Sequence, residues 1–207
     1  QAVRRFSQYN ETSYADFAKA QAAQFGNVRP LLPVDGKTLR FNFVQNDKLT
    51  PLRFDGQALL EGAPGGVRGQ VTVLGDKPID IVAGAADQPT AGVISVSADT
   101  LSALRASTLS IGGIYSYFDG QSSGGDSARV YFSSGSALGR AVNVRDGATL
   151  RAGQIFLVGG QIEVDGGAVL DTRGMGRPGV DSGLGYLFAN AIGESAASYS
   201  PGVLAVS

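Results

Sequence analysis

The chain has 207 residues and contains no cysteine, no histidine and no tryptophan. Without cysteine there are no disulfides, no thiol nucleophile and no cysteine-based zinc site. Without histidine the commonest general base and the commonest transition-metal ligand are missing, so a Ser-His-Asp triad cannot be built within the chain. Proteins that cross bacterial envelopes in an unfolded state also commonly lack cysteine, although many cytosolic proteins lack it too.

Charge is scarce as well. Only 17% of the residues are charged and the formal net charge is -1, with no basic patch, so nucleic acid is not expected as a partner. No apolar run approaches the roughly 20 residues of a membrane-spanning helix. The chain begins at Gln1 without a charged-then-apolar leader. We therefore expect a segment of a longer protein, with any signal peptide outside it.

Residues 10–25 give the one clear helix pattern. Thr12 or Ser13 can cap its start, with Asp16 in the capping-box position after Ser13, and Gly26 is suited to cap its end. Open sheet edges need covering. We therefore expect this helix to pack on or cap the strands that follow.

Glycine is abundant, and the most informative pattern in the chain is a repeat. Val144–Leu150 (VRDGATL) returns 20 residues later as Val164–Leu170 (VDGGAVL), with short apolar runs between glycines. Three short strands in each period of 20 residues indicate one coil of a parallel β-helix. The alternation predicts inward side chains at Ala148, Leu150, Ile155, Leu157, Ile162 and Val164. It predicts outward ones at Thr149, Arg151, Gln154, Gln161 and Glu163.

The rest of the chain is strand-rich by the same reasoning. We expect strands at 38–43, 52–54, 59–60, 70–74, 78–82, 186–189 and 203–206, a strand-turn-strand pattern over 92–114, and a further coil in phase at 128–132. The predicted fold is all-β: a right-handed parallel β-helix (solenoid) over 66–207, preceded by a helix and β-rich lead-in over 1–65. Polar excursions leave it at 119–127 and 174–183.

Two further stretches carry a family resemblance. Ser97–Leu104 and Ser107–Gly113, together with the repeat and the trailing Thr172-Arg173-Gly174, resemble the filamentous-haemagglutinin-like exoproteins of bacterial two-partner secretion. The resemblance covers residues 92–183 best, and its motifs are strand-and-turn motifs.

The resemblance implies secretion through an outer-membrane β-barrel transporter as partner, and display at the cell surface or release from it. It implies adhesion as the default function, with a host-cell glycan or receptor as ligand. It supplies no binding residue that can be carried over to this chain. A polysaccharide-processing β-helix enzyme that uses acidic residues is one alternative. An inert stalk that presents a distal effector or toxin domain is another.

The acidic candidates for the enzyme alternative are Glu163 with Asp165, and Asp171 with Asp181. Asp165 stands in an Asp-Gly turn, and the other acids fit a solvated surface, so ordinary structural roles explain them better. The Gly-Gly-x-Gly-x-Asp array of calcium-binding repeats is absent. We therefore predict no enzyme activity, no catalytic residue, no cofactor and no metal ligand.

Any recognition surface is expected in the loops that leave the shaft. Tyr115, Tyr117 and Phe118 stand directly before the polar stretch 119–127, and an exposed aromatic cluster there could stack on sugar rings. The alternative is that these rings are buried against neighbouring coils or the helix. The Gly-rich stretch 174–183 is the second candidate loop.

Overall fold

The computed structural model describes residues 13–27, 34–43, 52, 54–86, 90–118, 127–132, 141–176, 185–190 and 202–206. For Tyr14, Gly202 and the strands 115–118, 127–132 and 185–190 it describes the backbone alone. The chain divides into two compact units, residues 1–34 and residues 35–207. Each unit is described by itself.

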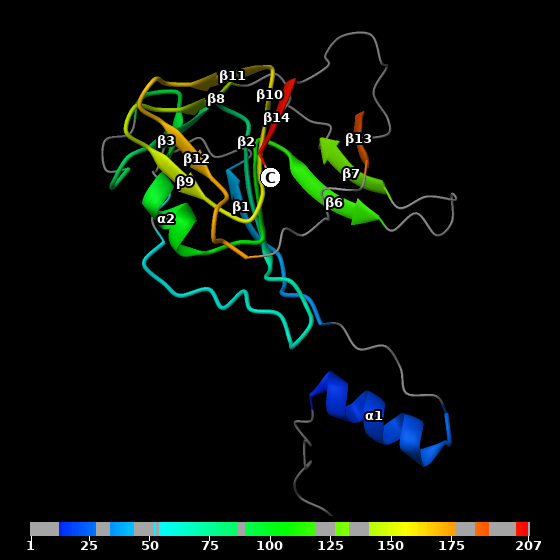
Figure 1. Ribbon diagram of the computed structural model, residues 1–207. Helices are drawn as coiled ribbons and strands as arrows, with labels where there is room; N and C mark the ends of the chain where they lie inside the picture. The colour runs from blue at the N-terminus through cyan, green and yellow to red at the C-terminus, as the bar shows by residue number, and fades with distance from the viewer. Residues whose placement is uncertain are drawn as a thin grey trace, which may run out of the picture. The chain divides into compact units, whose positions relative to one another are not determined.

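The first unit holds helix α1 (Tyr14–Gln24), within the predicted range (Figure 1). Ser13 is the N-cap: its Oγ accepts the Asp16 amide at 3.1 Å and donates to Asp16 Oδ2 at 2.7 Å. At the other end Gly26 takes a left-handed φ of 64°, and the Asn27 amide donates back to the Ala22 carbonyl at 2.9 Å. The predicted caps are thus confirmed. That the helix packs on or caps the strands stays a prediction.

The second unit is built mostly from strands. The five-stranded sheet has the order β1-β2-β5-β10-β14, the four-stranded sheet β11-β8-β3-β4, the three-stranded sheet β13-β7-β6 and the two-stranded sheet β12-β9. The bounds are β1 (Leu39–Phe43), β2 (Gln70–Gly75), β3 (Ile79–Val82), β4 (Ile94–Ser97), β5 (Thr108–Ile111), β6 (Ile114–Phe118), β7 (Ser127–Phe132), β8 (Ala141–Val144), β9 (Thr149–Arg151), β10 (Ile155–Gly159), β11 (Gln161–Val164), β12 (Val169–Asp171), β13 (Gly185–Asn190) and β14 (Gly202–Val206).

Most strand pairs are parallel. Only β10–β14 and β6–β7 run antiparallel among the described pairs. The predicted predominance of strands is confirmed in the described part of the chain, where two short helices accompany the strands. Residues 52, 54 and 59–60, which were expected to be strands, are not in strands.

The repeat of 20 residues appears directly in the strand register. Strand β11 pairs with β8 so that Ile162 lies beside Val142 and Val164 beside Val144. Strand β12 pairs with β9 so that Leu170 lies beside Leu150. Both pairs are parallel, and partners differ by 20 in residue number. The sequence repeat therefore stacks on itself in register.

The turn between these strands also repeats. The Ala148 amide donates to the Arg145 carbonyl, and the Ala168 amide to the Asp165 carbonyl, both at 3.0 Å. Gly147 has a φ of 73°, a conformation that L side chains rarely adopt. The Asp165 carboxylate accepts the Asp146 amide at 3.1 Å, so one turn is bonded to the next.

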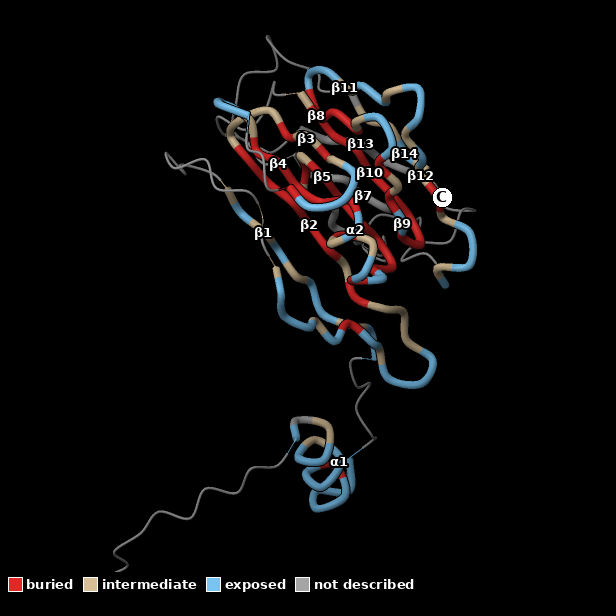
Figure 2. The backbone as a smooth tube through the Cα atoms, turned by 90° about the vertical axis from the view of Figure 1, so that its left-hand side faces the viewer, coloured by how far each residue is buried: buried red, intermediate tan, exposed pale blue. Residues whose placement is uncertain are grey.

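The core lies between the sheets. Val142, Val144, Ala148, Leu150, Ile155 and Leu157 are fully buried, in agreement with the inward positions that were predicted among them. Figure 2 shows how burial varies along the backbone: β2, β5 and β10 are buried, whereas β11 is largely exposed.

The burial of two residues differs from the prediction. Gln154, expected to face outward to solvent, is fully buried; it directly precedes β10, a strand that is buried along its whole length, and its backbone carbonyl accepts the Leu109 amide at 2.8 Å. Val164, expected to face the core, is 40% exposed because it lies in β11, the end strand of its sheet. Thr149, Arg151, Gln161 and Glu163 are not buried, as expected.

Residues 128–132 do not form a further coil in phase, contrary to the prediction. They lie in β7, which pairs with β6 on one side and β13 on the other, in a separate sheet. Strand β6 contacts β2 and β5, so this sheet lies against the five-stranded one. The physical reason is the antiparallel β6–β7 pair, which satisfies the hydrogen bonds of β7 away from β9.

The strand-turn-strand prediction for 92–114 was partly wrong. Strands β4 and β5 are present, but Ala98–Ala103 between them forms the short helix α2. Ser97 caps it by accepting the Thr100 amide at 3.2 Å. The helix lies against β9, at the place where a third strand of the two-stranded sheet would pair (Figure 1).

Candidate functional site

The edge of β9 that faces α2 is completed by a side chain instead of a strand. The Ser102 hydroxyl donates to the Thr149 carbonyl at 3.1 Å and accepts the Arg151 amide at 2.9 Å. One hydroxyl thus replaces both partners that a neighbouring strand would offer. This contact fixes α2 on the β9 edge, with Ala103 at the end of the helix exposed.

Two hollows open on either side of the end of α2. One, of about 690 Å³, is lined by Asp99, Ser102, Ala103, Arg105, Thr149, Arg151 and Met175. The other, of about 520 Å³, includes Phe54, Gln57, Leu59, Glu61 and Arg68 in its lining. They share Asp99, Ala103 and Arg105. We call the two together the α2 groove.

Arg105 lies where the two hollows meet, in an unusual backbone conformation. Its φ is 50°, and it is the one non-glycine residue with a positive φ in the described part of the chain. It follows the C-cap Leu104, a position that usually belongs to glycine. Strained residues of this kind cluster at functional sites, where the surrounding structure maintains them.

Neighbouring groups hold Arg105 in place through its backbone. The Arg68 Nε donates to the Arg105 carbonyl at 2.7 Å, and the Arg105 amide donates to the Ser102 carbonyl at 3.0 Å. Arg68 also pairs with Glu61 at 2.9 Å. The pKa of Glu61 is lowered, first by a hydrogen bond from its own backbone and then by Arg68. The exposed Arg105 side chain has no ion pair among the described residues.

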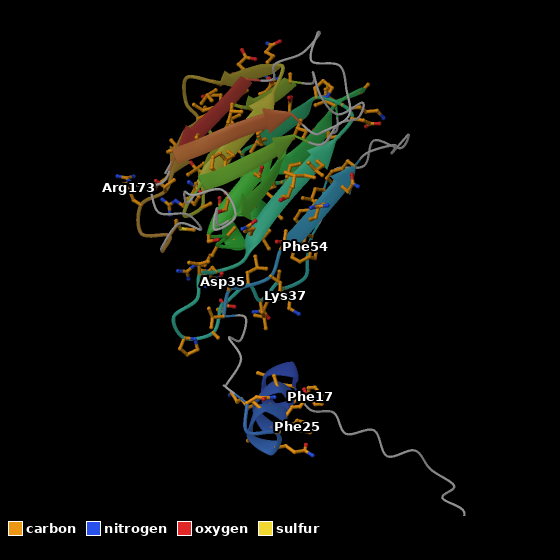
Figure 3. The ribbon with its side chains drawn as sticks, turned by 90° about the vertical axis from the view of Figure 1, so that its right-hand side faces the viewer. Phe17, Phe25, Asp35, Lys37, Phe54 and Arg173 are labelled. Atoms are coloured by element: carbon orange, nitrogen blue, oxygen red, sulfur yellow. The ribbon has the colours of Figure 1, made fainter. Side chains whose placement is uncertain are left out.

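The other end of the groove carries aromatic and apolar surface. Phe54, labelled in Figure 3, packs edge-to-face on Phe41, and their ring centroids are 5.7 Å apart. Leu59 is 75% exposed. The α2 groove thus combines exposed cations and half-buried hydroxyl residues with a positioned aromatic ring, a mixture that suits polar ligands with apolar faces, such as sugars.

The carboxylate pair Asp171 and Asp181 is not brought together among the described residues, because Asp181 lies outside them. Asp171 itself is nearly buried and accepts Arg173 Nε at 2.8 Å and the Arg173 amide at 3.1 Å. Arg151 approaches it at 3.5 Å. The Arg173 side chain, which projects from the edge of the second unit (Figure 3), holds the pKa of Asp171 below its usual value through its hydrogen bond. Asp171 is therefore an anion held in place by arginines at the last residue of β12.

Glu163 and Asp165 are also occupied separately. Glu163 Oε2 lies 3.4 Å from Arg145 Nη1, while Asp165 accepts the Asp146 amide. Arg145 pairs chiefly with Asp80 at 3.0 Å, which raises the pKa of Arg145. These contacts give both acids structural roles. Within the described residues, no three acidic side chains gather closely enough to hold a metal ion.

The aromatic residues that were predicted to contact a ligand lie on β6. Tyr115 pairs with Val130, Tyr117 with Ala128 and Phe118 with Ser127 in the β6–β7 ladder. The polar stretch 119–127 therefore connects these two strands, and residues 119–126 lie outside the described residues. Of the second loop, 177–183 also lies outside them. Binding by Tyr115, Tyr117 and Phe118 stays a prediction.

Sequence reasoning missed the α2 groove. Its lining comes from four stretches far apart in the chain, 54–68, 99–105, 149–151 and Met175, which the fold brings together. One pattern in the sequence could have pointed to this site. Ser97-Ala98-Asp99-Thr100 is a helix-capping pattern, and Arg105 stands where a short helix that begins there usually ends in a glycine.

Comparison with family models, curated proteins and solved structures finds no match to this chain. Neither of the helices in the described part of the chain is long and apolar enough to cross a membrane.

Proposed function

We propose that strands β2–β5 and β8–β12 form coils of a right-handed parallel β-helix, and that the chain is a segment of a filamentous-haemagglutinin-like exoprotein. One observation carries this proposal. The chain visits the four-stranded, two-stranded and five-stranded sheets in the order β8, β9, β10, and then returns to the first two with β11 and β12. Each return adds a parallel strand 20 residues later.

The function that fits this geometry best is an adhesin-type shaft on the bacterial surface or in the medium. A stack of coils presents a long, stiff surface, and its stability comes from neighbouring coils instead of one central nucleus. Secretion would require an outer-membrane β-barrel transporter as partner, and the ligand would be a host-cell glycan or receptor. No cofactor takes part.

The α2 groove is the surface that we propose for ligand contact. It is hollow, it exposes Arg105 at the junction of two cavities, and it carries Phe54 at one end. The β6–β7 strands with Tyr115, Tyr117 and Phe118 are the second candidate surface.

Binding of the full chain to a glycan panel and to cultured epithelial cells tests the proposal. We expect binding that falls at least about tenfold in Arg105→Ala and Arg151→Ala, because each removes an exposed guanidinium from the groove. Arg40→Ala, which changes an exposed arginine on β1, is the matched control and should bind as the original chain does.

Two other results would favour the alternatives. A well-folded chain that binds nothing would favour an inert stalk that presents a distal effector domain. Turnover of a polysaccharide that disappears in Asp171→Asn or Asp181→Asn would favour an enzyme.

A further inference from the structure

One end of the stack is uncovered on two of its faces. Val164 is 40% exposed, whereas Val144, its equivalent one repeat earlier, is fully buried. Leu170 is half-buried, whereas its partner Leu150 is fully buried. Val169 is 45% exposed. The same positions of the repeat thus lose their cover at β11 and β12.

The backbone at this end is unpaired as well, in the part of the chain that the structure describes. Strand β11 is the end strand of the four-stranded sheet, and β12 the end strand of the two-stranded sheet. In the five-stranded sheet the corresponding place beside β10 is taken by β14, which runs antiparallel. A further parallel coil therefore cannot add its strand directly to β10.

The opposite end of the four-stranded sheet does not offer a complementary edge. The Leu52 amide donates to the Ser95 carbonyl of β4 at 3.2 Å. Head-to-tail stacking of one copy on the next would need that β4 edge to be open. Between the two ends of the four-stranded sheet, β11 is then the open one, so a second copy that extends this sheet pairs its own β11 with β11 about a two-fold axis.

The hydrogen-bonding direction of β11 fits such a pair. The Asp165 amide donates to the Val144 carbonyl of β8 at 2.9 Å. Since backbone amides alternate sides along a strand, the amides and carbonyls of Ile162 and Val164 point away from β8, toward the open edge.

We propose that two copies of this chain associate through this end, with β11 antiparallel to the second copy's β11 and Ile162 opposite its equivalent. In this register Ile162 exchanges both of its backbone hydrogen bonds with the second copy. Antiparallel extension is the form that β14 already takes on β10 at the same end. The association is independent of the proposed function.

Charge selects this register over the next one. With Ile162 at the centre, Gln161 lies opposite Glu163 of the second copy, and an amide can donate to a carboxylate at both ends of the pair. With Glu163 at the centre, the two carboxylates would lie directly opposite each other, which is unfavourable. Gln161 and Glu163 are both exposed and lie on the outward side of β11.

The contact is small. Two short strand edges bury less than the roughly 800 Å² per partner of a standard interface, so we expect a concentration-dependent dimer with a Kd in the micromolar range. Sedimentation velocity of the full chain, from about 5 to about 500 µM, should show a shift from monomer to dimer and no larger species.

Val164→Lys and Val169→Lys should each weaken the dimer at least about tenfold, since a lysine would be desolvated at the contact. Leu59→Lys is the matched control: it changes an exposed apolar residue of the α2 groove and should dimerise as the original chain does. All three positions are exposed, so the variants should keep the circular dichroism spectrum of the original chain.

Gln161 tests the register itself. Gln161→Lys should tighten the dimer about three- to tenfold, through two new pairs with Glu163, and Gln161→Glu should weaken it by a similar factor. A chain that stays monomeric over the whole range overturns the proposal. So does a dimer that is unchanged in both lysine variants, or a series of ever larger oligomers, which would indicate head-to-tail growth.

Discussion

Removal of the Ser102 hydroxyl should destabilise the chain, although serine to alanine favours a helix. The hydroxyl holds the Thr149 carbonyl and the Arg151 amide of β9. Each hydrogen bond contributes about 1 kcal/mol net to stability. The gain in helix propensity offsets about 0.5 kcal/mol of the loss. Ser102→Ala should therefore lower the free energy of unfolding by about 1.5 kcal/mol.

Urea unfolding followed by circular dichroism measures this change, and hydrogen exchange of the Arg151 amide localises it. Thr100→Ala is the control, because it makes the same helix more alanine-rich and its side chain makes no hydrogen bond among the described contacts. It should be neutral or slightly stabilising. The account of α2 as a replacement for a strand is refuted if Ser102→Ala changes stability by less than about 0.3 kcal/mol, or if Thr100→Ala costs as much.

Three further changes follow from the same structure. Gly112→Ala should cost roughly 2 to 4 kcal/mol in urea unfolding, because Gly112 has a φ of 83° and an added Cβ would meet the Val158 carbonyl; Gly166→Ala, with open space around it, should stay within about 0.5 kcal/mol. Arg105→Gly should be about 1 kcal/mol more stable than Arg105→Ala, because only glycine takes a positive φ without strain, and equal stabilities would contradict the strain. The pKa of Asp171 lies below its ordinary value of 3.8, so the stability that this carboxylate contributes is present above pH 3.8 and is lost as the pH falls through the folded-state pKa. Between about pH 5 and about pH 2 the original chain should therefore lose more stability than Asp171→Asn. Equal losses in the two chains would contradict this.

The sequence predicted best where a local pattern decides the structure. The repeat at Val144 and Val164 predicted both the strands and their register, because an alternating pattern with fixed turns leaves little choice of pairing. The caps of α1 were also readable, since Ser13, Asp16 and Gly26 act on their nearest neighbours.

Prediction failed where distant contacts decide. The helix at Ala98–Ala103 has a local cause in the Ser97 cap, but its position on the β9 edge depends on the distant contact of Ser102. Residues 128–132 have the spacing of a coil but pair with β6. Of the candidate acids, Asp165 has the turn role that its Asp-Gly pair predicted, whereas Asp171 was expected on a solvated surface and is buried beside Arg173.

The α2 groove shows the same limit for the site. Phe54, Arg105 and Arg151 come from three separate stretches, and no spacing in the sequence links them. The backbone strain at Arg105 is likewise a property of the folded chain, because an arginine in that position is unremarkable until its φ is known.

The central claim is that residues 20 apart stack side by side, and a cross-link between engineered cysteines tests it most directly. The chain has no cysteine of its own, so Thr149→Cys with Val169→Cys gives one defined pair. Neighbouring strands lie about 4.8 Å apart, within the range that a disulfide spans. We expect rapid intramolecular oxidation of this pair and little of Thr149→Cys with Asp171→Cys, which is two residues out of register. Equal oxidation of both pairs, or faster oxidation of the second, would contradict the claim.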